Sequence, residues 1–155
     1  MASSLRSTLS AVLRFTLVLV APLACSGTSE PLDAPSAIIT FAFVGHPTDT
    51  MHVLVSRQST IAAAEAYIDK HRGAHLLAGT IVRGAGVDSR YPFQFIPESV
   101  QLIDAAIELC DGAPMRTDAA VNDFFEASLG SRTAPAATWC PWSSYPIQVQ
   151  QLLPD

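Results

Sequence analysis

The sequence is poor in charge and has no long hydrophobic run. Only 15% of its 155 residues are Asp, Glu, Lys or Arg, whereas 49% are hydrophobic. A chain with this many apolar side chains is not a disordered acidic tail, and its length allows one domain. Nine Lys and Arg residues against 14 Asp and Glu give a net charge of -5. This charge argues against nucleic acid or any other partner bound through its phosphates.

Motifs of nucleotide and metal chemistry are missing as well. The glycines of Gly84-Ala-Gly86 indicate a turn, because no Lys and no helix follow them as in a phosphate-binding loop. His71 and His75 are four residues apart, but Gly73 between them predicts that the helix ends before His75. We therefore expect neither a cofactor nor a metal ion.

Serine chemistry has little support. No Gly-x-Ser-x-Gly motif occurs, and no His has a carboxylate at a spacing typical of a catalytic triad. A hydrolase using one of the available serines is therefore the weakest functional hypothesis. Those serines are Ser59, Ser143 and Ser144.

The first 24 residues resemble an export signal. They contain Arg6 and Arg14, no acidic residue, and an apolar run over 15–24. This run has half of the roughly 20 residues that a membrane-spanning helix needs. A buried N-terminal helix is disfavoured because Arg14 would interrupt its apolar face and Pro22 would break its last turn. We expect a signal peptide over 1–24 and a tether over 25–37.

The fate of Cys25 has two alternatives. Leu23-Ala24-Cys25-Ser26-Gly27 resembles the cleavage box of bacterial lipoproteins, in which the Cys is lipidated, although Pro22 stands where such boxes carry Leu. Lipidation would anchor the protein in the bacterial cell envelope, with no other contact to a membrane. Ordinary cleavage after Ala24 or Ser26 would release a secreted or periplasmic protein.

The remaining 38–155 is predicted to form one α+β domain. Patterns of alternation and helical periodicity predict two helices and a mixed or antiparallel sheet of about five strands. The segment 99–110 fits either a helix or a strand. The predicted strands are 38–44 and 51–55, forming a hairpin, then 75–83 and 91–96; the predicted helices are 59–71 and 114–129.

Two cysteines are left for the fold if Cys25 carries a lipid. In an oxidising compartment, Cys110 and Cys140 are predicted to form a disulfide. The alternative is two buried free thiols.

Aromatic residues cluster near the C-terminus. One alternative is that Trp139 or Trp142 covers the disulfide as a lid on the core. The other is that Trp139, Trp142 and Tyr145 form an exposed surface for a ligand or partner. Tyr91, at the end of the loop 84–91, is a further candidate for that surface. A rigid loop on a scaffold is a common place for binding residues.

Several motifs together resemble a known family. They are Gly79-Thr-Ile-Val-Arg-Gly84, Val87-Asp88, Pro97-Glu-Ser-Val100, Ile107-Glu-Leu-Cys-Asp-Gly-Ala-Pro114 and Cys140-Pro-Trp-Ser-Ser144. The chain is similar over about 51–150 to the small exported domain at the N-terminus of the cAMP-inducible protein family, which also occurs in bacterial secreted proteins. The resemblance implies an α+β domain in which 102–110 is a strand.

The resemblance gives little guidance on function. Some members are labelled calmodulin-binding, but both predicted helices carry acidic residues and lack the basic face of a calmodulin target. Relatives carry a His and an Asp where this chain has Gln94 and Ile96. We expect a monomeric, non-enzymatic module that binds an unknown protein or small ligand. An extracellular protease inhibitor is the alternative, on the basis of size, export and disulfide.

Overall fold

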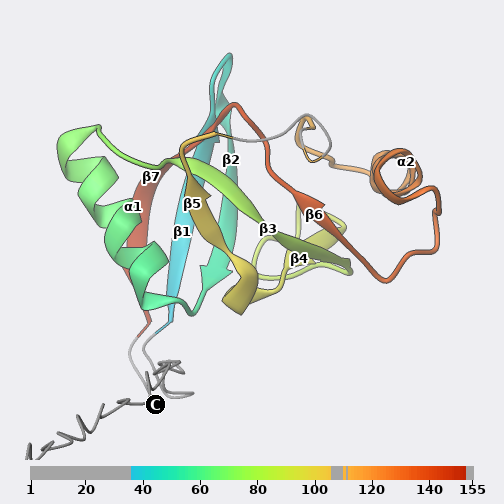
Figure 1. Ribbon diagram of the computed structural model, residues 1–155, viewed down its shortest axis with the longest axis horizontal. Helices are drawn as coiled ribbons and strands as arrows, with labels where there is room; N and C mark the ends of the chain where they lie inside the picture. The colour runs from blue at the N-terminus through green and yellow to red at the C-terminus, as the bar shows by residue number, and fades with distance from the viewer. Residues whose placement is uncertain (1–35, 106–109, 111, 153–155) are drawn as a thin grey trace, which may run out of the picture.

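Two antiparallel sheets and two helices make up the chain over 36–105, 110 and 112–152, the residues that the computed structural model describes (Figure 1). This confirms the predicted α+β class. The predicted signal peptide, Cys25 and the tether as far as residue 35 lie outside the described residues. The elements are β1 (Ala37–Phe43), β2 (His46–Val55), α1 (Gln58–Lys70), β3 (Leu76–Arg83), β4 (Phe93–Phe95), the 3-10 turn η1 (Pro97–Ser99), β5 (Gln101–Ile103), α2 (Asp118–Leu129), β6 (Ala136–Trp139) and β7 (Ser144–Gln151).

The first sheet has the strand order β2-β1-β7. The predicted hairpin is confirmed, because β1 pairs antiparallel with β2 from Ala37 opposite Val55 onward. Strand β2 begins at His46 and not at Met51 as predicted, because residues before Met51 also pair with β1. Strand β7 pairs along the other edge of β1 and was missed by the sequence patterns. Alternate residues of β1 enter the core, and Ile39, Phe41 and Phe43 are completely buried.

The second sheet is organised around β3. Its first residues pair with β5, while its second half lies between β4 and β6. Gly79 in β3 permits this packing, because a Cβ there would come within 2.9 Å of the Phe95 ring. The ambiguous segment 99–110 forms a strand over 101–103, and residues 106–109 lie outside the described residues.

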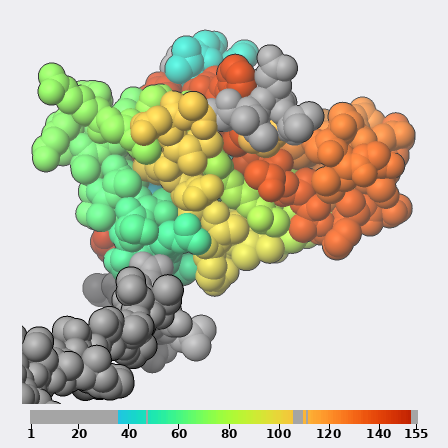
Figure 2. Space-filling view, in the orientation of Figure 1, coloured from blue at the N-terminus to red at the C-terminus, as the bar shows by residue number. Residues whose placement is uncertain are grey.

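The helices lie at opposite ends of the molecule's long axis (Figures 1 and 2). Helix α1 packs on β7 and β5, and α2 packs next to β6. Helix α2 begins four residues later than predicted, because Thr117 is its N-cap and accepts a hydrogen bond from the Ala120 N–H at 3.2 Å. The buried side chains of α2 are Val121 and Phe125.

Two serine hydroxyls accept hydrogen bonds from backbone N–H groups of β3. The Ser99 hydroxyl accepts from the Thr80 N–H at 2.8 Å, and the Ser144 hydroxyl accepts from the Leu77 N–H at 2.9 Å. Ser144 also donates to the Pro141 carbonyl at 2.7 Å, and it is 1% exposed. This serine therefore joins β3 to the chain just before β7.

Replacing Ser144 with alanine should lower the free energy of unfolding by about 1 to 3 kcal/mol, because it leaves the buried Leu77 N–H without an acceptor. Urea unfolding of the two proteins measures the difference. Ser143→Ala is the matched control, since Ser143 is the neighbouring residue and its side chain has no such bond. Equal stability of both variants would contradict this role of Ser144.

Candidate functional site

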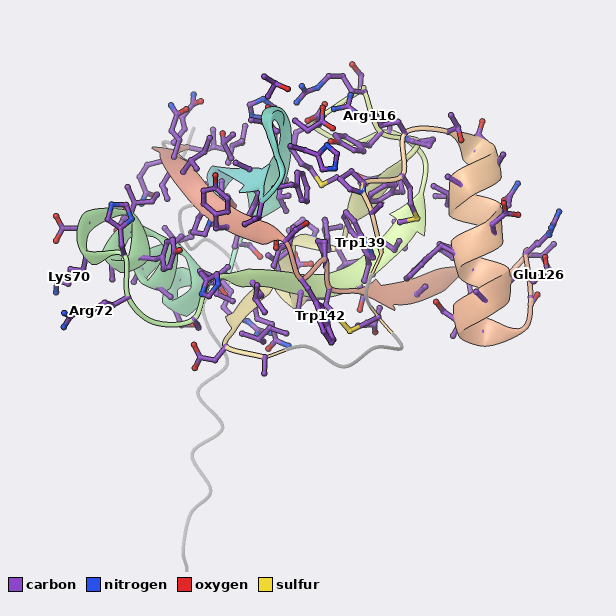
Figure 3. All side chains as sticks on the ribbon, turned by 90° about the horizontal axis from the view of Figure 1, so that it is seen from above. Lys70, Arg72, Arg116, Glu126, Trp139 and Trp142 are labelled. Carbon is purple, nitrogen blue, oxygen red and sulfur yellow. A yellow bond between two sulfur atoms is a disulfide. The ribbon has the colours of Figure 1, made fainter. Side chains whose placement is uncertain are left out.

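The structure separates the four aromatic candidates for a binding surface. Trp139 and Tyr91 are 0% and 1% exposed, so both belong to the core. Trp142 is 44% exposed, and Tyr145 is half-buried. Trp142 therefore remains as the exposed aromatic candidate, at the position shown in Figure 3.

The predicted disulfide is present between Cys110 and Cys140, whose Cα atoms are 5.1 Å apart. The Cys140 N–H also donates to the Cys110 carbonyl at 2.7 Å. Both cysteines pack in a small cluster with Ala78 and Ile103, apart from the main core that contains Trp139. Two residues after Cys140, the chain carries the exposed Trp142.

A buried carboxylate anchors the loop between β3 and β4. Asp88 is 7% exposed and accepts from the His52 backbone N–H at 3.0 Å, which lies on the outer edge of β2. The Arg90 guanidinium donates to both Asp88 oxygens, at 2.8 and 2.7 Å, and to the Thr50 carbonyl at 2.9 Å. The buried Tyr91 hydroxyl donates to the same carbonyl at 3.2 Å. These bonds fix the loop rigidly to β2.

The pKa of the Asp88 carboxyl is lower than that of an ordinary aspartate. Burial raises this pKa, but the hydrogen bonds from Arg90 and from the His52 N–H lower it by more, to about 2 from the ordinary 3.8. A carboxyl whose pKa is lower in the folded protein stabilises the fold above the unfolded pKa. That contribution is lost as the pH falls through the folded pKa.

Acidification from pH 5 to pH 2 should therefore cost the wild type about 1 to 2 kcal/mol of unfolding free energy through Asp88, allowing for the exposed Arg90 side chain at 42%. The difference between wild type and Asp88→Asn, measured by urea unfolding at both pH values, isolates this contribution. An acid-induced loss of the same size in the variant would contradict it.

A shallow hollow of about 410 Å³ lies beside this loop. Three arginines line it, and each comes from a different segment: Arg83 ends β3, Arg90 belongs to the β3–β4 loop, and Arg116 precedes α2. The other lining residues are Gly84, Ala85, Ser89, Tyr91, Pro92 and Asp118. Loop 84–91 was predicted as part of a binding surface, whereas Arg83 and Arg116 were missed because their convergence has no signature in the sequence.

Thr40 and His52 form a polar pair near Asp88, but within the part of the chain that the structure describes these residues are not arranged as a catalytic triad. The Thr40 hydroxyl lies 3.2 Å from the His52 Nδ1 across β1 and β2. The nearby Asp88 binds the His52 backbone N–H and not its imidazole, so it does not orient the ring as a triad carboxylate does. The pair arises from the register of β1 and β2, in which Thr40 is opposite His52.

His71 and His75, between α1 and β3, both pack on Tyr67. His71 adopts a left-handed conformation at the C-cap of α1, and its ring meets the edge of Tyr67. The His75 ring stacks on Tyr67 with centroids 5.0 Å apart. Within residues 36–105, 110 and 112–152, no group of three His, Cys, Asp or Glu side chains is arranged to hold a metal ion.

Comparison with known proteins adds one relationship. A model of the family described as the BP-74 N-terminal domain matches residues 37–152, which span β1 to the end of β7. No curated protein and no solved structure matches the chain significantly.

Proposed function

The chain belongs to the BP-74 N-terminal domain family, and we propose that it is a non-enzymatic binding module that acts after export. Family membership implies no activity, so the proposal rests on how the polar side chains are used. Ser99, Ser144 and Asp88, which all belong to the family-like motifs, accept hydrogen bonds from backbone N–H groups of β3 or β2. These motifs serve the scaffold, which supports a role in presenting a surface.

The exposed Trp142 is the observation on which the proposal depends. Its segment is held on both sides, by the disulfide at Cys140 and by the buried hydroxyl of Ser144. In addition, the Val44 N–H donates to the Ser143 carbonyl at 2.7 Å and ties the β1–β2 turn to this segment. A large aromatic side chain on a rigid backbone loses little entropy on binding, and such residues dominate the affinity of many interfaces.

Capture of partners by the immobilised protein from envelope extract tests this proposal. Trp142→Ala should abolish capture while leaving the stability of the fold nearly unchanged. Ile147→Ala is the matched control, because Ile147 on β7 is 43% exposed and equally apolar. Equal capture by all three proteins would overturn the proposal, and unfolding of Trp142→Ala would return Trp142 to the scaffold.

Export and lipidation are the second part of the proposal. The disulfide is compatible with an extracellular location. No helix in the described part of the chain is long and apolar enough to cross a membrane. We propose cleavage of 1–24 and a lipid on Cys25, and mass spectrometry of the mature N-terminus tests both. A mature protein that begins elsewhere or lacks a diacylglycerol mass would refute the lipid anchor. The narrower relationship to a cAMP-inducible protein stays a prediction.

A further inference from the structure

The hollow beside the β3–β4 loop has the features of an anion site. We propose that Arg83, Arg116 and Ser89, which line this hollow, bind the phosphate group of a small organic phosphate monoester. This site goes beyond the proposed function because it lies away from Trp142. Figure 3 shows Arg116 and Trp142 on opposite sides of the buried Trp139.

The concentration of positive charge is the first argument. The hollow gathers three of the seven Lys and Arg residues in the described part of an acidic chain. Like charges that lie close together repel one another, so a cluster of arginines is stabilised by nearby negative charges. Arg90 is paired with Asp88 at 2.7 Å and Arg116 with Asp49 at 2.7 Å.

Arg83 has no such counter-ion among the described residues. Its guanidinium donates to the Asn122 side-chain oxygen at 2.6 Å and to the Arg132 carbonyl, and it lies 4.5 Å from the centre of the Phe125 ring. All of these partner groups are neutral. These contacts hold the guanidinium in place but do not neutralise its charge. A bound anion would supply the missing negative charge.

Hydrogen-bond donors remain available at the same place. A guanidinium has five N–H donors, and Arg83 and Arg116 use only some of theirs in the bonds to protein atoms. The Ser89 hydroxyl lines the hollow and makes no hydrogen bond within the described residues. Arg116 is further fixed by lying 5.2 Å from the centre of the Tyr91 ring.

The charge and size of the hollow favour a phosphate ester over a carboxylate or a bare ion. In this protein one arginine suffices for each carboxylate, as Arg90 and Arg116 show. A phosphate monoester carries about 1.5 to 2 negative charges and three acceptor oxygens, which suit several arginines. A volume of about 410 Å³ also leaves room for an organic group.

The net charge of -5 does not prevent such binding. Exposed charges farther away than about 8 Å are largely screened at physiological salt, so a single phosphate experiences mainly the local arginines. A long polyanion would extend into the acidic surroundings, and the overall charge still argues against it. Asp118 also lines the hollow, and its carboxylate opposes the ligand.

Calorimetric titration of the protein with phenyl phosphate at low ionic strength tests the proposal. Arg83→Gln and Arg116→Gln should each weaken binding about tenfold, the usual cost of losing a charge-assisted hydrogen bond. Asp118→Asn should strengthen binding severalfold. Arg72→Gln is the matched control, because it removes the same charge from a residue just after α1, away from Arg116, and should change nothing (Figure 3).

Three further measurements sharpen the outcome. Binding of phenyl phosphate should tighten between pH 5 and pH 7.5 as its second proton leaves with a pKa near 6, whereas benzoate should bind more weakly at both pH values. Glycerol phosphate and vesicles containing phosphatidic acid distinguish a soluble ester from a lipid headgroup. Trp142→Ala should leave phosphate binding unchanged, which separates this proposal from the preceding one.

Two results would overturn the phosphate site. One is the absence of saturable phenyl phosphate binding to the folded wild type. The other is equal weakening by Arg72→Gln and Arg116→Gln, since that would show attraction by overall charge only. Because Arg83 also contacts α2, thermal melts accompany each titration, and Arg116→Gln and Asp118→Asn decide the question if Arg83→Gln fails to fold.

Discussion

Replacing Cys110 and Cys140 together with alanine is expected to lower the free energy of unfolding by about 3.5 kcal/mol. The disulfide joins residues 30 positions apart. In the chain-entropy model, a crosslink of this span lowers the conformational entropy of the unfolded chain, and this loss of entropy corresponds to about 3.5 kcal/mol of stability. The enclosed segment contains α2 and β6. Without the bond, these elements would be held by packing, by the pairing of β6 with β3 and by hydrogen bonds such as that from Arg83 to Asn122.

Urea unfolding of the double variant, with reduced wild type as a second measure, gives the size of the effect. Ala78 and Ile103 pack against the cysteine pair, so some of the loss also reflects the cavity left by the two sulfur atoms. A loss below about 1 kcal/mol would contradict the expectation. It would show that the unfolded chain is already restricted over this segment without the crosslink.

Replacing Trp139 with alanine is expected to cost about 3 to 5 kcal/mol, the range found when a large buried aromatic side chain is removed. Trp139 is completely buried. Its ring forms a T-shaped pair with Phe93, with centroids 5.2 Å apart, and stacks on Phe95, with centroids 5.8 Å apart. It ends β6 and packs on two aromatic side chains of β4, while β3 pairs with both of these strands. Its loss therefore weakens the packing of the whole second sheet.

Trp142→Ala is the matched comparison because it removes the same side chain three residues away. With 44% of Trp142 exposed, we expect a loss of less than about 1 kcal/mol. Thermal and urea unfolding of the two variants should differ clearly. Similar losses would contradict the division between a core tryptophan and a surface tryptophan.

Local sequence patterns were sufficient for much of the fold. The helix predicted over 59–71 is α1 at 58–70, because its apolar spacing and its glycine stop are local features. The hairpin of β1 and β2 followed from the β-branched and aromatic residues over 38–44 and the alternating apolar residues over 51–55. The pairing of Cys110 with Cys140 followed from their number and from the expectation of export.

Strands β6 and β7 were missed because their extended conformation depends on pairing. Strand β7 contains Pro146 and several exposed glutamines, which are not typical of a strand. It is extended because its backbone pairs with β1, a strand about 100 residues earlier. Periodicity within β7 could not predict a bond whose partner lies so far away.

The sequence alone predicted the α+β class, the first hairpin, the two helices and the disulfide partners. These features depend on local periodicity and on a small number of cysteines. The burial of Trp139 and the exposure of Trp142 could not be predicted in this way, because burial depends on what packs against each side chain. Likewise, Arg83, Arg90 and Arg116 meet at one hollow only after β3, its following loop and the start of α2 have folded together. Contacts between distant segments set both results, and no local pattern records them.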